Sequence, residues 1–328
     1  MKEWSHSSVG LPALVLAIAV LVPVVATGQS AETQAAGSGN VTRTSWGDPD
    51  LRGTWTSNGA RGVPMERPKE VLTAADEARQ EVLREFSRND QTLNVLFVEP
   101  ETDITQHFDK PPVLVVDPPN GRIPFTPELQ AASDSWKAAS HGVGIDSWED
   151  LDLWDRCITK GGPPMNVLPA AYNNGILILQ TSDHVAILHE IIHEVRIIPL
   201  DGRDHLDPRI HQYWGDSRAH WEGDTLVVEV TNYSDKTFGT QQPKGSYRGG
   251  GRGQRVVERF TRIDDGTLEY RATVEDPRGF TKPWTVVVPL LRDDDYVLYE
   301  YACHEGNYGL EQILKAHLGP GTSDSDGR

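Results

Sequence analysis

Residues 183–232 read DHVAILHEIIHEVRIIPLDGRDHLDPRIHQYWGDSRAHWEGDTLVVEVTN, and this stretch decides the fold. It holds six of the 11 histidines of the chain and its densest runs of Val and Ile, residue types that favour strands. The run over residues 185–198 ends at Pro199 and is followed by Asp201-Gly202, which is typical of a strand that passes into a turn. The sequence therefore predicts one long central strand over residues 185–198.

Alternation with period two divides this predicted strand into two faces. One face is aliphatic apart from two imidazoles, and its members are Val185, Ile187, His189, Ile191, His193, Val195 and Ile197. The other face carries Glu190, Glu194 and Arg196 among aliphatic residues. We expect the first face to point inward and to place two imidazoles in a polar-lined cavity. The competing interpretation is that each is a core histidine whose ring nitrogens are bonded by neighbours.

His189-Glu190-Ile191-Ile192-His193 also matches the HExxH motif of zinc proteases. In those enzymes the motif lies on a helix, where two histidines four residues apart share one face and reach one metal ion. On a strand, residues four apart are separated by roughly 13 Å, which is too far to share a zinc ion. The strand therefore predicts no metal site. A helix through the same run is the alternative, since its aliphatic residues also recur at helical spacing.

Charge and motifs exclude several classes of partner. The chain has 328 residues, a net charge of −17 and a pI of about 5.0. Such an acidic protein is not expected to bind nucleic acid or an anionic membrane surface, both of which attract basic patches. The sequence contains no phosphate-binding Gly-rich loop with Lys, no nucleophile elbow and no dinucleotide fingerprint. No cofactor is therefore expected.

The first residues resemble a targeting segment. Residues 11–26 are apolar and uncharged, and small residues precede Gln29 at the positions that signal peptidase prefers. We expect residues 1–28 to be a cleaved signal peptide, which makes the protein periplasmic or secreted; an uncleaved anchor helix is the alternative. No membrane contact is expected after cleavage, because no later stretch is long and apolar enough to span a bilayer.

Composition divides the rest of the chain into four parts. Residues 29–44 are small and polar and predict a disordered lead, and residues 319–328 predict a disordered tail. Residues 45–155 predict an extension of helices and loops with a first strand and a small hairpin. Residues 156–318 predict an antiparallel β domain.

In the extension, helices are expected at residues 74–86, from Pro127 onward and at residues 148–154. Pro is favoured at the first position of a helix, which supports the second of them. A strand is expected to open at Gly53, and an Asn-Gly pair at residues 120–121 predicts the turn of a small hairpin.

In the β domain, strand-like runs alternate with tight turns. A strand at residues 176–180 precedes the central strand, and three hairpins follow it, at residues 218–232, 255–275 and 281–304. Strands joined by tight turns pair antiparallel in chain order. The predicted fold class is mainly β: an antiparallel meander forming a lipocalin-like barrel or a strongly curved sheet, with an N-terminal helix and loop extension. A short helix at residues 310–317 ends the ordered chain.

Alternation also predicts which residues of the later strands face inward. They are Leu226, Val228, Val230, Asn232, Leu268, Tyr270, Ala272, Val274, Val297, Tyr299, Tyr301 and Cys303. The tyrosines give this interior polar groups as well as bulk. Such a surface suits a small aromatic or terpenoid-like molecule with one polar group.

Cys157 and Cys303 are the only cysteines of the chain. In an exported protein an even pair indicates a disulfide rather than two free thiols. This disulfide would tie the centre of the chain to its last predicted strand. The alternative is a reactive thiol at Cys303, which His304 and Glu305 follow.

Six segments carry a resemblance to known proteins. They are WGDPDLRGTWT (46–56), PPNGRIPFT (118–126), DRCITKGGPP (155–164), RIIPLDGR (196–203), GDSRAHWEGDTLVVEVTNY (215–233) and YEYACHEGNYG (299–309). Together they resemble a large family of proteins secreted by environmental bacteria, and the resemblance covers most of the chain after residue 28. It implies export and no particular reaction. Gly-x-Trp at Gly53 also makes the predicted barrel similar to a lipocalin.

Polar side chains at predicted strand ends and turns are the candidates for chemistry. The predicted acid/base residues are His193, His220, His304 and Asp216, and the predicted ligand-binding residues are Tyr172, Asn173, Arg196, Arg203, Arg218, Trp221, Tyr299 and Tyr301. An imidazole titrates near neutral pH, a guanidinium holds an oxyanion and a carboxylate orients an imidazole. The alternative for Asp216 and Arg218 is a structural ion pair.

These residues predict a protein that binds a small, partly apolar organic molecule in a His/Arg/Tyr-lined barrel cavity. One form of the hypothesis adds cofactor-free acid/base chemistry on that molecule. One alternative is a zinc-dependent hydrolase that uses three of His189, His193, His211 and His220. Another is a non-catalytic envelope module whose polar groups are structural. The sequence decides neither the ligand, nor whether a reaction occurs, nor the oligomeric state.

Overall fold

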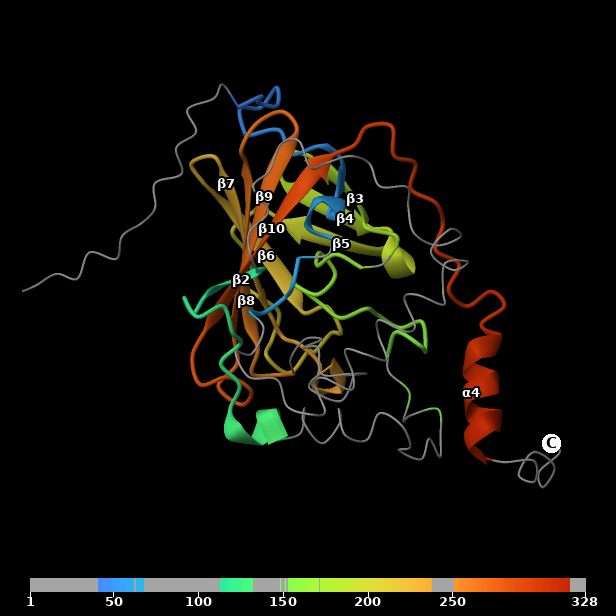
Figure 1. Ribbon diagram of the computed structural model, residues 1–328. Coiled ribbons are helices and arrows are strands. Elements are labelled where there is room, and N and C mark those ends of the chain that lie inside the picture. The colour runs from blue at the N-terminus through green and yellow to red at the C-terminus, as the bar shows by residue number, and fades with distance from the viewer. Residues whose placement is uncertain are drawn as a thin grey trace, which may run out of the picture. The chain divides into compact units, whose positions relative to one another are not determined.

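Strands that follow one another along the chain build a single antiparallel sheet (Figure 1). The computed structural model describes residues 41–61, 63–67, 113–131, 148, 151, 153–170, 172–237 and 251–318. All of them belong to one compact unit, residues 37–328.

The sheet contains ten strands. They are β1 (Gly53–Thr56), β2 (Val115–Asp117), β3 (Gly175–Gln180), β4 (His184–His189), β5 (Glu194–Pro199), β6 (Asp216–Glu222), β7 (Thr225–Thr231), β8 (Arg255–Arg262), β9 (Thr267–Glu275) and β10 (Trp284–Arg292). Besides a short helical segment at residues 127–131, the named helical elements are η1 (Asn58–Ala60), η4 (Ile191–His193), η5 (Asp235–Thr237) and α4 (Tyr308–Leu318). The last of these confirms the helix predicted at residues 310–317.

The sheet curls into a nearly closed barrel, as the sequence predicts. Nine strands follow the order β5-β4-β3-β1-β10-β9-β8-β7-β6, and β2 pairs with β10. Two meanders of consecutive strands, β3–β5 and β6–β10, are therefore joined through β1. Trp55 of β1 lies opposite Ile176 of β3 on one side and Arg292 of β10 on the other.

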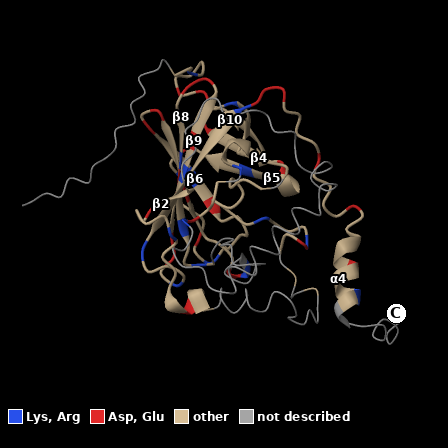
Figure 2. Cartoon of the chain, viewed as in Figure 1, with Lys and Arg blue, Asp and Glu red and all other residues tan. Residues whose placement is uncertain are grey.

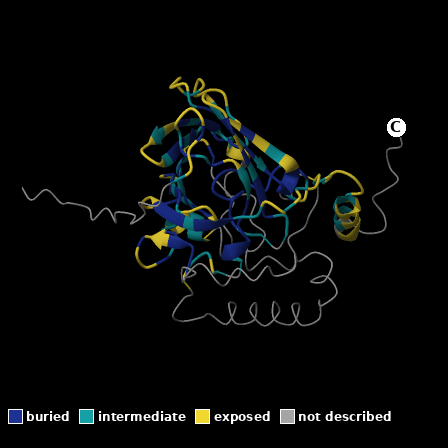
Figure 3. Ribbon diagram, turned by 90° about the horizontal axis from the view of Figure 1, so that it is seen from above, coloured by how far each residue is buried: buried dark blue, intermediate teal, exposed yellow. Residues whose placement is uncertain are grey.

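The core lies inside this curled sheet, and it follows the alternation of the strands. On β9, Leu268, Tyr270, Ala272 and Val274 are all fully buried, and the residues between them are only partly buried. Figure 3 shows buried positions along the strands, whereas α4 is drawn as exposed or intermediate. Each large apolar side chain buried in this way contributes about 1.5–3 kcal/mol. The inward residues predicted for β9 are confirmed, as are those predicted within β7.

The single strand predicted over residues 185–198 is wrong, because the chain reverses in its middle. β4 ends at His189, the turn η4 occupies Ile191–His193, and β5 runs back along β4. Ile192 has a φ of 62°, a left-handed conformation that costs a β-branched residue on the order of 1–3 kcal/mol. Tertiary contacts must therefore hold this turn against the strand preference of its residues.

Glu190 supplies those contacts. Its backbone N–H donates to the Gly175 carbonyl at 3.0 Å, and its carboxylate accepts the Tyr296 hydroxyl at 2.6 Å and the Tyr299 N–H at 3.5 Å. A Cβ atom at Gly175 would lie 2.7 Å from the Tyr296 ring and 2.9 Å from the Glu190 carboxylate. Only glycine lets the three segments approach so closely.

The turn also shifts which residues face inward. The inward residues of the β4–β5 hairpin are Val185, Ile187, His189, Arg196 and Ile198. His193, Val195 and Ile197, which the uninterrupted strand placed inside, are exposed. The prediction fails for these three because a strand that turns back starts a new alternation.

The predicted strand at residues 296–304 is also wrong. β10 already pairs with β9 on one side and with β1 and β2 on the other. Neither edge of β10 is therefore free to pair with a returning strand. The chain leaves the sheet after Arg292 and continues without strand structure to residue 307. Val297 and Tyr299 are 62% and 75% exposed, which corrects their prediction as inward residues.

The N-terminal extension shows one further correction. The hairpin predicted around residues 120–121 does not form, because Val115 pairs with Val286 of β10 instead. The helix predicted from Pro127 is present over residues 127–131, and the Thr126 hydroxyl accepts the Leu129 N–H at 3.3 Å, as a helix cap does. Trp148 belongs to a 3-10 helix, whereas residues 151 and 153–157 form a bend and turns, so the described residues do not show the helix predicted over residues 148–154. The signal peptide and the helix predicted at residues 74–86 lie outside the described residues.

Charged residues are distributed unevenly between the strands and the loops. The strands are drawn mostly in tan in Figure 2, and many acidic positions lie in the loops at their ends. Where the structure describes the chain, it contains no helix with the length and apolar character needed to cross a membrane.

Candidate functional site

A buried ion pair lies inside the sheet. Arg196 of β5 donates from Nη1 and Nη2 to Oε1 and Oε2 of Glu258 on β8, at 3.1 and 2.5 Å. The two side chains are 4% and 0% exposed. Arg196 Nη2 also donates to the Ser217 hydroxyl at 3.0 Å, and the Tyr270 hydroxyl donates to Glu258 Oε1 at 2.9 Å. Strands β5, β6, β8 and β9 thus meet at one polar cluster.

The strands position this pair through their alternation. Glu258 lies in phase with the buried residues Val256 and Phe260, so its carboxylate points into the core. The hydrogen bond from Arg196 to Ser217 crosses from β5 to β6, the two end strands of the sheet. The pair therefore helps to close the barrel from within.

The electrostatics of the cluster favour the charged pair. Burial lowers the pKa of Arg196, but the charge and hydrogen bonds of Glu258 offset it, and the pKa is raised. Burial and the negative charge of Glu258 raise the pKa of Tyr270 well above its usual value. Tyr270 is therefore a neutral hydroxyl that donates to the carboxylate.

A second group of polar residues lies beside the pair. Asn166 Nδ2 donates to His189 Nε2 at 2.8 Å, and the Trp214 ring lies 5.5 Å from the His189 ring between centroids. His189 is 1% exposed. Burial lowers its pKa well below 6.5, and the positive charges of Arg196 and Lys160 lower it further. The imidazole is therefore neutral at physiological pH.

Several polar atoms of the interior have no hydrogen-bond partner in the part of the chain that the structure describes. They are Arg196 Nε, His189 Nδ1, Asn166 Oδ1, Trp214 Nε1 and Trp221 Nε1. A buried polar atom without a partner costs about 1–3 kcal/mol. Three of these atoms belong to the group formed by His189, Asn166 and Trp214, and Arg196 Nε belongs to the ion pair itself.

Of the ligand-binding residues predicted from the sequence, the structure places Arg196 and Trp221 inside. Arg196 belongs to the ion pair, and Trp221 packs against the core from β6. Both come from strands, which hold a side chain more rigidly than a loop does.

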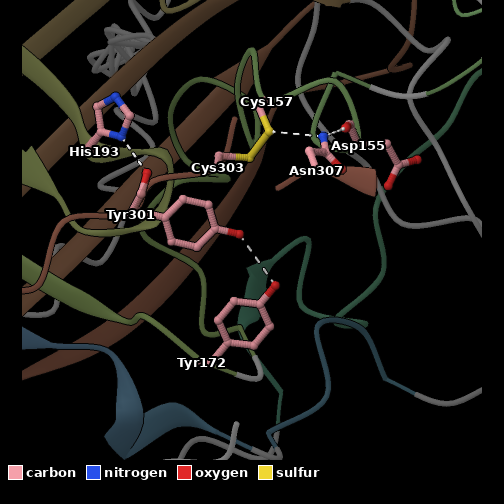
Figure 4. The surroundings of a disulfide bond; sticks show 7 residues. All are labelled: Asp155, Cys157, Tyr172, His193, Tyr301, Cys303 and Asn307. Carbon is pink, nitrogen blue, oxygen red and sulfur yellow. Dashed lines mark hydrogen bonds between the residues drawn. A yellow bond between two sulfur atoms is a disulfide. The ribbon is translucent and has the colours of Figure 1, made fainter. Parts of the chain in front are cut away.

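His193 and His220 lie outside, which corrects the prediction that both line one interior pocket. His193 is exposed in the turn after β4 and donates from Nδ1 to the Tyr301 carbonyl at 2.7 Å (Figure 4). His220 points outward from β6 and contacts Glu222 at 3.1 Å. His193 is displaced by the hairpin turn, and His220 lies one residue out of phase with the inward residues Ala219 and Trp221.

Asp216 and Arg218 form the structural ion pair that was the alternative interpretation, with Nη1 and Oδ1 2.8 Å apart. Asp216 also accepts hydrogen bonds from His205 Nδ1 at 2.8 Å and from the Leu206 N–H at 3.0 Å. Arg218 Nε donates to the Asp204 carbonyl at 3.0 Å. These bonds fasten the loop after β5 to the outside of β6.

Arg203, His304 and Asn173 also lie apart from the interior cluster. Arg203 is exposed and pairs with Asp201 two residues away. His304 is exposed beside Cys303, and Asn173, with a φ of 53°, lies in the turn before β3.

Cys157 and Cys303 form the predicted disulfide, with their Cα atoms 5.6 Å apart (Figure 4). Asn307 lies beside it and donates to the Asp155 carbonyl at 3.0 Å. The Tyr172 and Tyr301 rings lie nearly parallel, 6.5 Å apart between centroids. The disulfide therefore joins the segment after β10 to the loop around Cys157, and the His193–Tyr301 hydrogen bond joins the same segment to the β4–β5 turn.

The HExxH residues do not have the arrangement of a zinc protease. His189 ends a strand and is buried, whereas His193 lies beyond the turn and is exposed. His211 lies in the loop between β5 and β6, and His220 is on the outer face of β6. Among the described residues, no three His, Cys, Asp or Glu side chains are grouped closely enough to hold a metal ion.

Sequence reasoning missed most of the interior cluster. It considered His189 only as an inward imidazole or zinc ligand, and it overlooked Glu258, Asn166 and Trp214. The signal for Glu258 is a carboxylate at an inward position of a strand whose other inward residues are apolar. No local pattern marks Asn166 or Trp214, because both come from loops.

Comparison with known proteins adds no family. No protein-family model matches the chain, and no curated protein is significantly similar to it.

Proposed function

We propose that the protein binds a small, partly apolar organic molecule inside the barrel-like sheet, beside the Arg196–Glu258 pair. The observation that carries this proposal is a buried, hydrogen-bonded ion pair inside the sheet, beside a neutral histidine and other polar groups with atoms that lack partners among the described residues. An apolar core of the same volume is often as stable as a buried ion pair or more stable. The pair is therefore better explained by ligand recognition than by stability alone.

The proposal includes export. The apolar run at residues 11–26 supports it, and so does the disulfide, because disulfides form and persist in oxidising compartments. The resemblance to a secreted bacterial family stays a prediction that points in the same direction.

Acid/base chemistry, if the bound molecule is transformed, would involve His189. It is the imidazole beside the Arg196–Glu258 pair, and burial holds it neutral, so with the Asn166 amide turned over its Nδ1 can accept a proton from a bound molecule. Binding is the part of the proposal that the interior contacts support directly.

The test is saturable binding of a neutral apolar probe, N-phenyl-1-naphthylamine, followed by its fluorescence. We expect one site per chain in the unmodified protein. In the double variant Arg196→Met/Glu258→Gln, which removes both charges together, affinity should fall at least tenfold while the melting transition stays cooperative.

The matched control is Arg203→Met/Asp201→Asn, which removes an Arg–Asp pair at the surface. It should bind the probe as the unmodified protein does. Absence of saturable binding, or equal affinity in the two double variants, would contradict the proposal and leave a structural role for the interior pair.

A further inference from the structure

The pair His189–Asn166 presents two unused hydrogen-bonding atoms to the interior. The side chains are bonded to each other at 2.8 Å, and they are 1% and 4% exposed. His189 Nδ1 and Asn166 Oδ1 have no partner among the described residues. The hydrogen bond therefore leaves one atom of each side chain able to bind a further group.

The character of these atoms follows from the neutral imidazole. A neutral imidazole carries one N–H, and the Asn166 amide offers one oxygen and one NH₂ group. With Nε2 accepting from Asn166, the imidazole proton is on Nδ1, which is then a free donor, and Asn166 Oδ1 is a free acceptor. If the amide is turned over, Nδ1 becomes the acceptor and the NH₂ group the donor. Either arrangement offers one donor and one acceptor.

Trp214 adds a second donor. Its indole lies 5.5 Å from the His189 ring between centroids and is 7% exposed. Its Nε1–H has no partner among the described residues, and an indole N–H can only donate. His189, Asn166 and Trp214 therefore offer two donors and one acceptor between them.

We infer that the interior site takes a neutral ligand whose polar group is a carboxamide or a lactam. A carbonyl oxygen accepts two hydrogen bonds and the adjacent N–H donates one, which complements the two donors and one acceptor of His189, Asn166 and Trp214. This inference rests on the proposed function and names the chemical class of its ligand.

The charges of the interior argue against a carboxylate ligand. The guanidinium of Arg196 is already bound through both terminal nitrogens by Glu258, and an anion beside this carboxylate would be repelled. Lys160 is the other cation near His189, and its amine donates to the Leu168 carbonyl at 2.8 Å. A carboxylate must therefore be compared directly with the amide.

The experiment measures the affinity of three probes of similar size by calorimetry: naphthalene-2-carboxamide, 2-naphthoate and 2-ethylnaphthalene. The carboxamide should bind at least tenfold more tightly than either of the others. In His189→Phe, the preference for the amide over the hydrocarbon should fall to less than threefold. His220→Phe alters an exposed histidine and should leave the preference unchanged.

Trp214→Phe is a second variant for the case that His189→Phe does not fold. It removes one donor and keeps an aromatic ring, so the preference should fall severalfold. Equal or tighter binding of the carboxylate, or equal binding of the hydrocarbon, would overturn the inference. If N-phenyl-1-naphthylamine still binds at the interior pair in that case, the proposed function stands; if it does not bind, the proposed function itself fails.

Discussion

His189 and His193 belong to one five-residue motif, yet they lie in opposite regions of the molecule. His189 is inside the sheet among partly unpartnered polar groups, and His193 is outside, bonded to the segment that the disulfide holds. The turn at Glu190 separates them. The spacing of residues in a motif therefore predicts how their side chains are arranged only when a single helix or strand contains all of them.

The interior region should be the more sensitive to change, and Arg196→Met tests this most severely. The substitution leaves the Glu258 carboxylate buried without its cation, which should cost about 3–5 kcal/mol of unfolding free energy. Urea denaturation of Arg196→Met and of Arg196→Met/Glu258→Gln measures it. The double variant should recover most of the loss. A double variant that loses the sum of two single losses would mean that the residues do not act as a pair.

Ile198 and Ile197 test the turn that separates the two regions. Ile198 is fully buried and Ile197 is 69% exposed. Ile198→Ala should therefore cost about 2–5 kcal/mol, and Ile197→Ala less than about 0.5 kcal/mol. The same denaturation measurement compares the two. A larger loss for Ile197→Ala than for Ile198→Ala would instead support the uninterrupted strand.

Removal of the disulfide should loosen the outer region and leave the interior ordered. Cys157→Ser/Cys303→Ser should cost about 2–4 kcal/mol, because the bond restricts the unfolded chain. Hydrogen exchange should increase at residues 296–307 and stay low in β8 and β9. Thiol titration of the denatured, unreduced protein should find no free thiol, and two free thiols in freshly purified protein would contradict the bond.

His189 should give the interior a dependence on pH. Because its pKa is lowered in the folded protein, the unfolded chain binds the proton first as the pH falls below about 6.5. The contribution of His189 to the free energy of unfolding is therefore greatest above that pH. Below that pH it decreases, by no more than about 1.4 kcal/mol per pH unit. His189→Gln should have a flatter stability profile below pH 6.5 in thermal melts. Parallel profiles would mean that the pKa of this imidazole is the same in the folded and unfolded protein.

His220→Ala should have the smallest effect. The imidazole is exposed and contacts only Glu222 among the described residues, and exposed ion pairs contribute about 0–1 kcal/mol. Its unfolding free energy should stay within about 0.5 kcal/mol of that of the unmodified protein. A larger loss would place this residue in the core.

The fold was predictable where turn residues are local. Gly223 and Gly266 mark the hairpins β6–β7 and β8–β9, and alternation then assigns their inward residues. The β4–β5 turn contains no Gly, Pro, Asn or Asp at residues 190–193, and it depends on bonds from Glu190 to Gly175 and Tyr296. Those partners are distant in sequence, so no local pattern reports the turn.

The site was predictable only in part, for the same reason. Arg196 was predicted as a ligand-binding residue because of its charge, although the uninterrupted strand placed it on the wrong face. Its partner Glu258 comes from another meander. Asn166 and Trp214 reach the interior from loops, whose course is set by the whole barrel.

β1 is the short strand that joins the two meanders of the sheet. Four residues, Gly53–Thr56, provide the backbone pairing that joins the meanders β3–β5 and β6–β10 among the described strands. Trp55 is fully buried there, and Gln180 holds the preceding loop through the Leu51 N–H and the Pro49 carbonyl. The backbone ladder between the two meanders therefore depends on one short strand, whereas the bonds from Arg196 to Glu258 and Ser217 join the same meanders through side chains inside the barrel.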